Sequence, residues 1–310
     1  MDFELDAEQA SVMEAVDVLL QRHAGPARAI ELQASGGYDY ELEDALAEAG
    51  FLDLGRAMGL LEGALLVERV AYRAGTVALA ARVLVGAQFG DVAVGPGPVA
   101  VTSLDHTGPV RFSSEARTLW VDGGEEAYRV EVPQGAAEPV RSNFGFPMGR
   151  LPAEVLRAGQ SMGAGSGAAL REAWRLGLAA ETVGAMDAAL MQTVEYLKAR
   201  RQFGRTIGSF QAVQHRLAEC AIEVEASRWL VREAAGVADR REAVCVAAAF
   251  ALAAAGRVFA ETHQLSGAIG FTREHDLHVW SMRLHALRQE LGGVQGHREA
   301  IVHERWRSGS

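Results

Sequence analysis

The segment RRQFGRTIGSFQAVQHRLAE, residues 200–219, separates two stretches in which apolar residues recur every three or four positions. Before it they are Val183, Met186, Leu190, Val194 and Leu197, and after it Val213, Leu217, Cys220, Val224, Ser227 and Val231. This spacing is that of one helix face, so the sequence predicts two long amphipathic helices joined at the segment. The joining residues include arginines, glycines and two phenylalanines, a set that a simple connection does not require.

Two further helices follow in the sequence. One apolar pattern covers 241–265, and another has Leu277, Trp280, Leu284, Leu287 and Leu291 at steps of three and four. Four long antiparallel helices form a bundle. The spacing therefore predicts a C-terminal four-helix bundle within residues 151–310.

The preceding residues divide into two parts. Residues 1–84 are predicted to be a helical domain, in which Asp6 caps a first helix with Gln9 three residues on, and Gly50 ends another helix. Residues 85–150 contain the short alternating runs PVAVTSL, TLWVDG and AYRVEV, which predict a reduced β-domain. The predicted fold class is mainly α with a small β unit.

Composition excludes several classes of protein. The chain has 310 residues, 49% of them hydrophobic, and a formal net charge of −10, which disfavours a general nucleic-acid binder. The longest apolar run, VCVAAAFALAAAG, is shorter than the roughly 20 residues that span a bilayer. We therefore predict a close-packed bundle helix there and no membrane span. Two cysteines within helical patterns and an acidic start lead us to expect a cytoplasmic protein.

Two segments resemble the acyl-CoA dehydrogenase family. In YLKARRQFGRTIGSFQAVQHRLAE, a helix ends in Arg-x-x-Phe-Gly and the next begins with Phe-Gln, as in that family. QLSGAIGFTREHDLHVW, at 264–280, is similar to its Gln-x-x-Gly-Gly-x-Gly-Phe/Tyr-Thr segment, and MDFELDAEQ and LAEAGFLDL resemble its opening. The resemblance implies an N-terminal helical domain, a middle β-domain and a C-terminal four-helix bundle, with FAD as the cofactor.

The resemblance also implies which residues contact the cofactor. In the family this hairpin crosses a subunit interface to hold the diphosphate end of a neighbour's FAD. The matching residues here are Arg200 at the diphosphate, Gln202, Phe203 and Gly204 beside it, Gln211 at the start of the next helix, and Gln264 and Gly267 in the second segment. Guanidinium groups suit phosphate oxygens, and glycines allow a close approach of backbone N–H groups. The alternative is that Arg200 complements the helix dipole and Gly204 is a C-cap glycine.

The family's catalytic carboxylate is absent at both positions where it occurs. Aligned from Arg283, the more common position falls on Gly292, and the alternative position falls on Trp174. Neither residue can take the α-proton of a thioester, so no catalytic residue is predicted in this chain. Residues that contact the flavin are also replaced, by Val294 and Gly296.

Other polar residues were weighed as substitutes. Glu290 lies two positions before Gly292, and residues two apart on a helix point to roughly opposite faces. Glu181 lies seven positions after Trp174. We expect solvated or structural roles for both. Glu274, His275, His278 and His285 suggest a metal site only weakly, and no metal is predicted.

The whole pattern is most similar to the shortened, non-catalytic subunits of actinobacterial heteromeric acyl-CoA dehydrogenases, several of which are associated with sterol side-chain catabolism. We therefore expect a hetero-oligomer, a heterotetramer with a base-containing subunit that acts on acyl-CoA. Exposed apolar residues, with Trp229, Phe250, Phe259 and Trp280 as candidates, would form its interfaces. The alternatives are a homomeric acyl-CoA enzyme with a relocated base, and a flavin-free assembly or scaffold protein.

Overall fold

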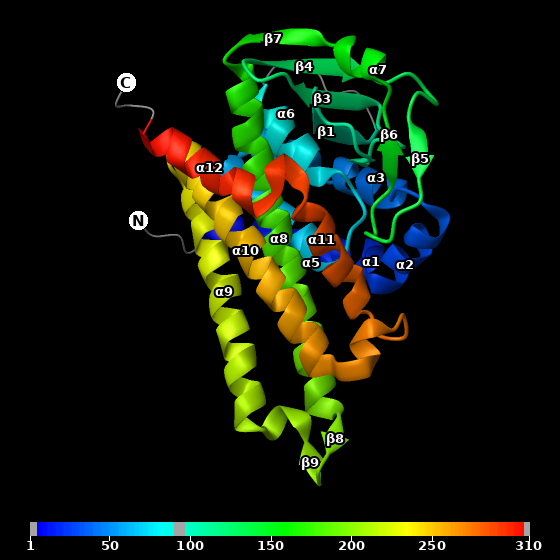
Figure 1. The fold of residues 1–310 in the computed structure, drawn as a ribbon, viewed down its shortest axis with the longest axis vertical. Coiled ribbons are helices and arrows are strands. Elements are labelled where there is room, and N and C mark those ends of the chain that lie inside the picture. The colour runs from blue at the N-terminus through cyan, green and yellow to red at the C-terminus, as the bar shows by residue number, and fades with distance from the viewer. Residues whose placement is uncertain (1–4, 90–96, 307–310) are drawn as a thin grey trace.

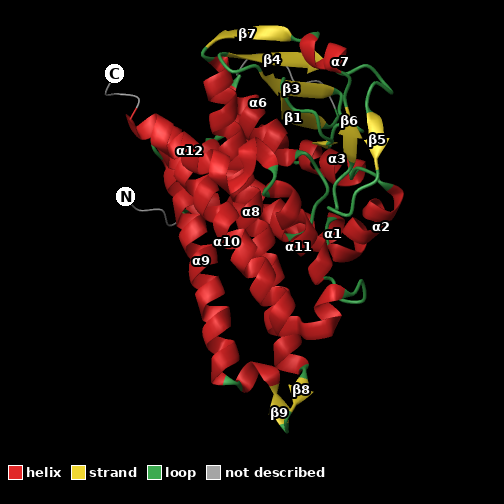
Figure 2. Ribbon diagram, viewed as in Figure 1, coloured by secondary structure: helices red, strands yellow, loops and turns green. Residues whose placement is uncertain are grey.

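The computed structural model describes residues 5–89 and 97–306. Helices form most of the molecule, and the larger sheets lie at one end of its long axis (Figure 1). Figure 2 shows a further, small hairpin at the opposite end, beyond the bundle. The mainly helical fold with a small β unit confirms the predicted fold class.

The N-terminal part is helical. Its elements are α1 Ala7–His23, α2 Pro26–Ser35, α3 Tyr40–Glu48, η1 Phe51–Asp53, α4 Leu54–Ala57, α5 Leu60–Tyr72, η2 Ala81–Val85 and α6 Gly86–Gln88. The predicted capping box is present: the Asp6 carboxylate accepts from the Gln9 backbone N–H, and the Gln9 side chain accepts from the Asp6 N–H. Gly50 follows α3 with φ of 78°, as a C-terminal glycine should.

The β unit contains two sheets. The first has the order β1-β3-β4-β7, formed by β1 Val99–Ser103, β3 Thr118–Asp122, β4 Glu126–Glu131 and β7 Gln160–Ala164, with β1 parallel to β3. The second has the order β2-β6-β5, formed by β2 Val110–Arg111, β6 Met148–Arg150 and β5 Glu138–Val140. Pairing of β7 with β4 extends the unit beyond the predicted boundary at 150. A helix, α7 Ala153–Arg157, comes before this strand, and β7 is largely exposed, so its residues lack the alternating apolar pattern.

The bundle contains α8 Ser166–Ala199, α9 Gln211–Gly236, α10 Arg241–Ser266, α11 Leu277–Leu287 and α12 Gly293–Trp306. The helix predicted over 277–291 ends early, at Leu287. Leu291, Gly292 and Gly293 all have positive φ, so the chain turns there in the 3-10 segment η5 Glu290–Gly292 before α12 begins. Two adjacent glycines make that turn possible.

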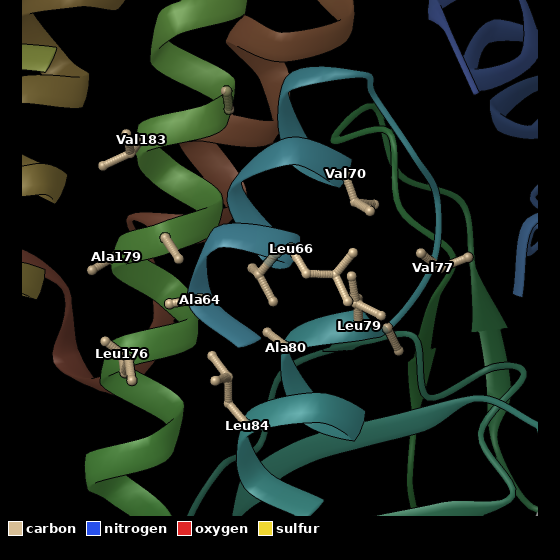
Figure 3. Packing of buried hydrophobic residues seen from close by; sticks show 14 of the residues in the cluster. Ala64, Leu66, Val70, Val77, Leu79, Ala80, Leu84, Leu176, Ala179 and Val183 are labelled. Carbon is tan, nitrogen blue, oxygen red and sulfur yellow. The ribbon is translucent and has the colours of Figure 1, made fainter. Parts of the chain in front are cut away.

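α8 is the central helix of the molecule. It packs against α5 on one side, and in Figure 3 Ala179 and Val183 of α8 point away from α5. The helices approach so closely at Gly184 that a Cβ atom there would lie 2.1 Å from the Glu68 carbonyl oxygen. This contact fixes α5 on the bundle, and with it the segment that leads into the β unit.

The alanine-rich helix was predicted to be a packed bundle helix. The segment 241–271 is long and apolar enough to cross a membrane, but 56% of its apolar window is buried inside the protein, as in the core helix of a soluble protein. Of the predicted interface residues, Trp229 and Phe250 are 41% and 39% exposed. Trp280 is 4% exposed and its Nε1 donates to the Tyr72 carbonyl oxygen, so its assignment to an interface was wrong.

Candidate functional site

A cavity of about 640 Å³ lies where the β unit meets the bundle. Its walls come from the end of β1, the segment 105–111, the segment 140–144, α8 and the turn after α11. Trp174 and Gly292, which the sequence analysis aligned with the two positions of the family's catalytic carboxylate, both line this cavity. The fold therefore brings together two residues 118 positions apart that sequence comparison had treated as alternatives.

Glu290 also lines the cavity, contrary to the prediction that it would lie on the opposite side of a helix from Gly292. That prediction assumed a continuous helix through both residues. The helix in fact ends at Leu287, and Leu291 takes a left-handed conformation with φ of 51° and ψ of 39°. The directions of Glu290 and Gly292 are therefore not those of residues two apart on a helix.

Arg111, which lines the cavity, connects the β unit to the bundle. Its Nε donates to Glu290 Oε1 at 2.8 Å, and its Nη1 donates to Glu181 Oε2 at 2.5 Å. Glu290 Oε2 accepts from the indole Nε1 of Trp174, also at 2.5 Å. The three charged side chains retain only 12% exposure for Arg111, 11% for Glu181 and 18% for Glu290. Glu181 and Glu290 are therefore structural and not solvated.

Burial and the neighbouring charges shift the pKa values of Arg111 and Glu181 in opposite directions. Burial alone would lower the pKa of Arg111, but the attraction of Glu181 and Glu290 outweighs it and raises that pKa. Burial raises the pKa of Glu181, and Arg111 opposes the rise only in part. Both Glu290 oxygens already accept hydrogen bonds, so this carboxylate is held in place as an acceptor.

A second buried arginine supports the same junction. Arg283, in α11, donates to the Gly75 carbonyl oxygen at 2.8 Å and to Thr76 Oγ1 at 2.7 Å. Burial lowers the pKa of Arg283 to about 10. The ring of Phe146 lies 4.9 Å from the guanidinium carbons of both Arg111 and Arg283. No motif marks Arg111 or Phe146 in the sequence, because Arg111 lies in a two-residue strand and Phe146 in an irregular segment.

The predicted cofactor-contacting residues lie elsewhere, on the hairpin between α8 and α9. β8 Arg201–Gln202 pairs with β9 Arg205–Thr206, and the short helix η3 Ile207–Ser209 follows. Phe203 and Gly204 form the turn, with φ of 54° and 81°. Since the backbone of Arg200 is extended and already ends α8, Gly204 is a turn residue and not the C-cap considered as an alternative.

The hairpin presents a cation and an aromatic ring to the surroundings. Phe203 is 90% exposed. No described residue accepts a hydrogen bond from the exposed side chain of Arg200. The Arg205 guanidinium carbon lies 3.8 Å from the centre of the Phe210 ring, which Phe203 meets edge-on at 6.3 Å. These contacts hold the hairpin residues Phe203, Arg205 and Phe210 in place, and the Arg200 guanidinium takes no part in them.

The second predicted segment lies at the same end of the bundle. Gln264 is exposed in the last turn of α10, and Gly267, with φ of 66°, ends that helix at η4 Gly267–Phe271. Tyr196, in the last turn of α8, contacts the ring of His275 at 5.3 Å, which links the two segments. Gln211 is the exposed first residue of α9. The structure thus gathers the predicted residues at one end.

This end lies opposite the cavity. In Figure 1 the β8–β9 hairpin forms the lower tip, whereas the β unit is at the top. Trp174 and Arg200 are separated along the continuous helix α8, a distance of about 39 Å at the helical rise per residue. A dinucleotide cofactor is shorter than this separation, so the hairpin and the cavity of one chain cannot serve one cofactor molecule.

Of the histidines that weakly suggested a metal site, His275 comes just before α11, and His278 and His285 lie in α11. His278 Nδ1 lies 2.9 Å from the His275 carbonyl oxygen, and the His285 ring packs against Phe259. Across residues 5–89 and 97–306, no three His, Cys, Asp or Glu side chains come together as a metal site would require.

Comparison with known proteins finds a family model that matches the C-terminal part of the chain. Residues 170–305 match the family model "Acyl-CoA dehydrogenase, C-terminal domain". The chain is 29% identical to acyl-CoA dehydrogenase IpdE2 of Mycolicibacterium smegmatis over 93% of this chain and 96% of that protein. It is 41% identical to IpdE2 of Mycobacterium tuberculosis over 42% of this chain and 41% of that protein, so this match spans less than half of the relative.

Solved structures share the whole fold. A chain of the ChsE4-ChsE5 complex from Mycobacterium tuberculosis superposes with a TM-score of 0.80 at 22% identity, over 100% of both chains. A chain of the Tcur3481-Tcur3483 steroid ACAD G363A variant superposes with a TM-score of 0.76 at 25% identity, over 97% of this chain and 98% of that one. The similarity therefore extends well beyond the C-terminal bundle.

Proposed function

We propose that this chain is an acyl-CoA dehydrogenase family oxidoreductase, and that it is the subunit without a catalytic base in a hetero-oligomeric, FAD-dependent acyl-CoA dehydrogenase. One observation carries the proposal. Both predicted base positions, Trp174 and Gly292, line the same cavity. Of the two carboxylates that also line it, Glu290 accepts hydrogen bonds at both oxygens and Asp105 is exposed.

The reaction needs a free carboxylate. Bound FAD supplies a hydride acceptor for the β-hydrogen of an acyl thioester, while a carboxylate takes the α-proton. In this chain the indole of Trp174 and the hydrogen of Gly292 cannot take that proton. Glu290 accepts from Arg111 and Trp174, so turning its carboxylate towards a substrate would break these bonds. We therefore assign the proton transfer to a base-containing homologous subunit.

The role left for this chain is to complete the partner's FAD site with its hairpin. Arg200 is exposed and has no acceptor among the described residues, and the hairpin projects from the end of the molecule opposite the cavity (Figure 1). A guanidinium suits the planar recognition of diphosphate oxygens. The residues proposed to contact the cofactor are Arg200, Gln202, Phe203, Gly204, Gln211, Gln264 and Gly267.

The descriptions of structural neighbours support a proposal for the substrate class, and the sequence composition supports one for the cellular location. One structural neighbour is described as a steroid ACAD and another is a two-component complex. We propose an acyl-CoA derived from lipid or sterol breakdown as the substrate of the assembled complex, a heterotetramer as its form, and the cytoplasm as its site.

Co-expression tests this function. The chain would be purified alone and together with a base-containing homologue from the same genome, and FAD content and acyl-CoA-dependent reduction of an electron acceptor would be measured. We expect flavin and activity only in the complex. Substantial activity of the chain alone would refute the proposal, and a complex whose partner binds FAD equally well without this chain would favour the scaffold alternative.

A relocated base is the second candidate, because Glu290 lies in the cavity between the two vacant positions. Glu290→Gln decides between the candidates. If Glu290 were the base, this variant would lose turnover by several orders of magnitude while retaining flavin. If the partner supplies the base, turnover of the complex would remain within a few-fold of the unmodified complex.

A further inference from the structure

The backbone of Arg200 is held on both sides, although its side chain is exposed. Its N–H donates to the Tyr196 carbonyl oxygen, and its own carbonyl oxygen accepts from the Ile207 N–H, each at 2.8 Å. The first bond comes from the last turn of α8, and the second comes from η3, which follows the β8–β9 hairpin. The point from which the Arg200 guanidinium extends therefore depends on the position of the last turn of α8.

The connection after the hairpin packs closely on that same turn. A Cβ atom added at Gly208, in η3, would lie 3.2 Å from the Leu197 carbonyl oxygen, which is tighter than ordinary van der Waals contact. Leu197 is itself buried. Because η3 touches the backbone of α8 here, the hairpin and the last turn of α8 move together.

The ring of Tyr196 connects this turn to the second segment with proposed cofactor contacts. Its centroid lies 5.3 Å from that of the His275 ring, with 42° between the ring planes, and both residues are half-buried. His275 lies between η4, which begins at Gly267, and α11. Its carbonyl oxygen lies 2.9 Å from His278 Nδ1 in the first turn of α11, so His275 is itself held in place.

The His275 ring suits an apolar contact. Burial lowers the pKa of its imidazole below 6.5, a shift that Asp276 opposes and His278 increases. The ring is therefore uncharged at pH 7, and its Nε2 is buried without a hydrogen-bond partner within residues 5–89 and 97–306. Aromatic rings at this separation stabilise each other when they are offset or tilted, as these two are.

We propose that Tyr196 is a positioning residue for cofactor binding: its contact with His275 sets the distance between Arg200 and the segment 264–267, so that both reach one cofactor molecule. The inference rests on the proposed function, in which Arg200 binds the diphosphate of a partner's FAD. Tyr196 then acts only through Arg200 and does not touch the cofactor. If its ring merely fills space between helices, its loss lowers stability and leaves the FAD affinity of the folded complex unchanged.

Titration of the flavin-stripped complex with FAD measures the effect. Tyr196→Ala should weaken FAD binding by about threefold to tenfold, which corresponds to the loss of one aromatic contact. His275→Ala should weaken it to a similar extent, whereas Tyr196→Phe keeps the ring and should retain the affinity. Tyr40→Ala is the control, because it removes a tyrosine of α3 whose hydroxyl bonds Glu115, and it should leave FAD binding unchanged.

The double variant Tyr196→Ala, Arg200→Ala shows whether Tyr196 acts through Arg200. Two residues that act as a unit do not have additive effects, so the double variant should bind FAD within about twofold of Arg200→Ala alone. A further loss as large as that of Tyr196→Ala would overturn the inference, and so would an equal loss in Tyr196→Phe. Tyr196→Leu takes the place of Tyr196→Ala if melting shows that the alanine variant does not fold.

The same set of variants separates this inference from the proposed function. Unchanged FAD affinity in both Tyr196→Ala and His275→Ala, with a clear loss in Arg200→Ala, would overturn the positioning role and leave the proposed function standing. Unchanged affinity in Arg200→Ala would overturn both, because Tyr196 would then have no cofactor contact to position.

Discussion

Glu181 and Glu290 lie 109 residues apart in the sequence, and both accept hydrogen bonds from the guanidinium of Arg111. Through this one side chain, β2 is held to the central helix α8 and to the turn that follows α11. The cluster therefore stabilises the junction between the β unit and the bundle.

Arg111→Ala should lower the free energy of unfolding by about 3–5 kcal/mol, because it leaves two largely buried carboxylates without their cation. Chemical denaturation of the purified chain measures this change. The triple variant Arg111→Met, Glu181→Gln, Glu290→Gln should recover most of the loss, since no unpaired charge remains. Arg56→Ala, which breaks an exposed pair with Asp53, is the control and should change stability little. A small effect of Arg111→Ala would contradict the structural role.

His297 should make stability depend on pH. This residue in α12 is fully buried, and burial lowers the pKa of its imidazole from 6.5 to about 4. Between these values the unfolded chain binds a proton that the folded chain does not, so stability is lost as the pH falls from 6.5 towards 4. The loss is about 3 kcal/mol when complete.

Denaturation midpoints between pH 4 and pH 7 measure this dependence. His297→Gln should flatten the curve in that window, whatever its effect on stability at pH 7. His303→Gln, at an exposed histidine on the same helix, should leave the slope as it is. An unchanged slope in His297→Gln would show that other groups cause the pH dependence.

The predictions succeeded where a short segment determines local structure. The capping box at Asp6 and the helix end at Gly50 were predicted correctly, because each depends on residues within one helical turn. The long helices were readable from apolar spacing, and the family motifs determined the order of domains. The match of residues 170–305 to the family model agrees with the segment in which those motifs lie.

The cavity was not predictable for a physical reason. Its floor is formed by contacts between residues 70 and 179 positions apart, and no local pattern marks Arg111 as their common partner. Glu290 was misplaced because apolar spacing continues through Leu291, although the backbone there leaves the helical conformation. Apolar spacing shows which side chains are apolar but not where a helix ends. Here the two glycines after Leu291 allow the backbone to turn.

Gly184→Ala should destabilise the chain, although alanine favours a helix more than glycine does. The added methyl group would lie 2.1 Å from a backbone carbonyl oxygen of α5, so the two helices must move apart, at a cost of about 1–3 kcal/mol. Thermal unfolding measures the change. Gly256→Ala on α10 is the matched control, because there the new methyl group meets only the end of the flexible Arg288 side chain. Equal stability of the two variants would contradict the close packing of α5 on α8.

Arg200→Ala tests the proposed function through charge. If the Arg200 guanidinium binds the diphosphate of a partner's FAD, its loss should cost about 1.5–3 kcal/mol of cofactor binding, which is roughly a tenfold to hundredfold drop in affinity. If Arg200 only complements the C-terminal dipole of α8, its loss should cost a few tenths of a kcal/mol of stability and leave flavin unchanged.

The two roles separate in one experiment. The variant would be purified with the base-containing partner, and both FAD per complex and the melting temperature of the flavin-stripped complex would be measured. Reduced FAD affinity with unchanged melting is the expected result, because the Arg200 side chain has no acceptor within the described part of its own chain. Arg22→Ala, which replaces an exposed arginine in the last turn of α1, controls for general loss of positive charge. Full occupancy and unchanged affinity in Arg200→Ala would refute the cross-subunit role and favour a scaffold without a part in flavin binding.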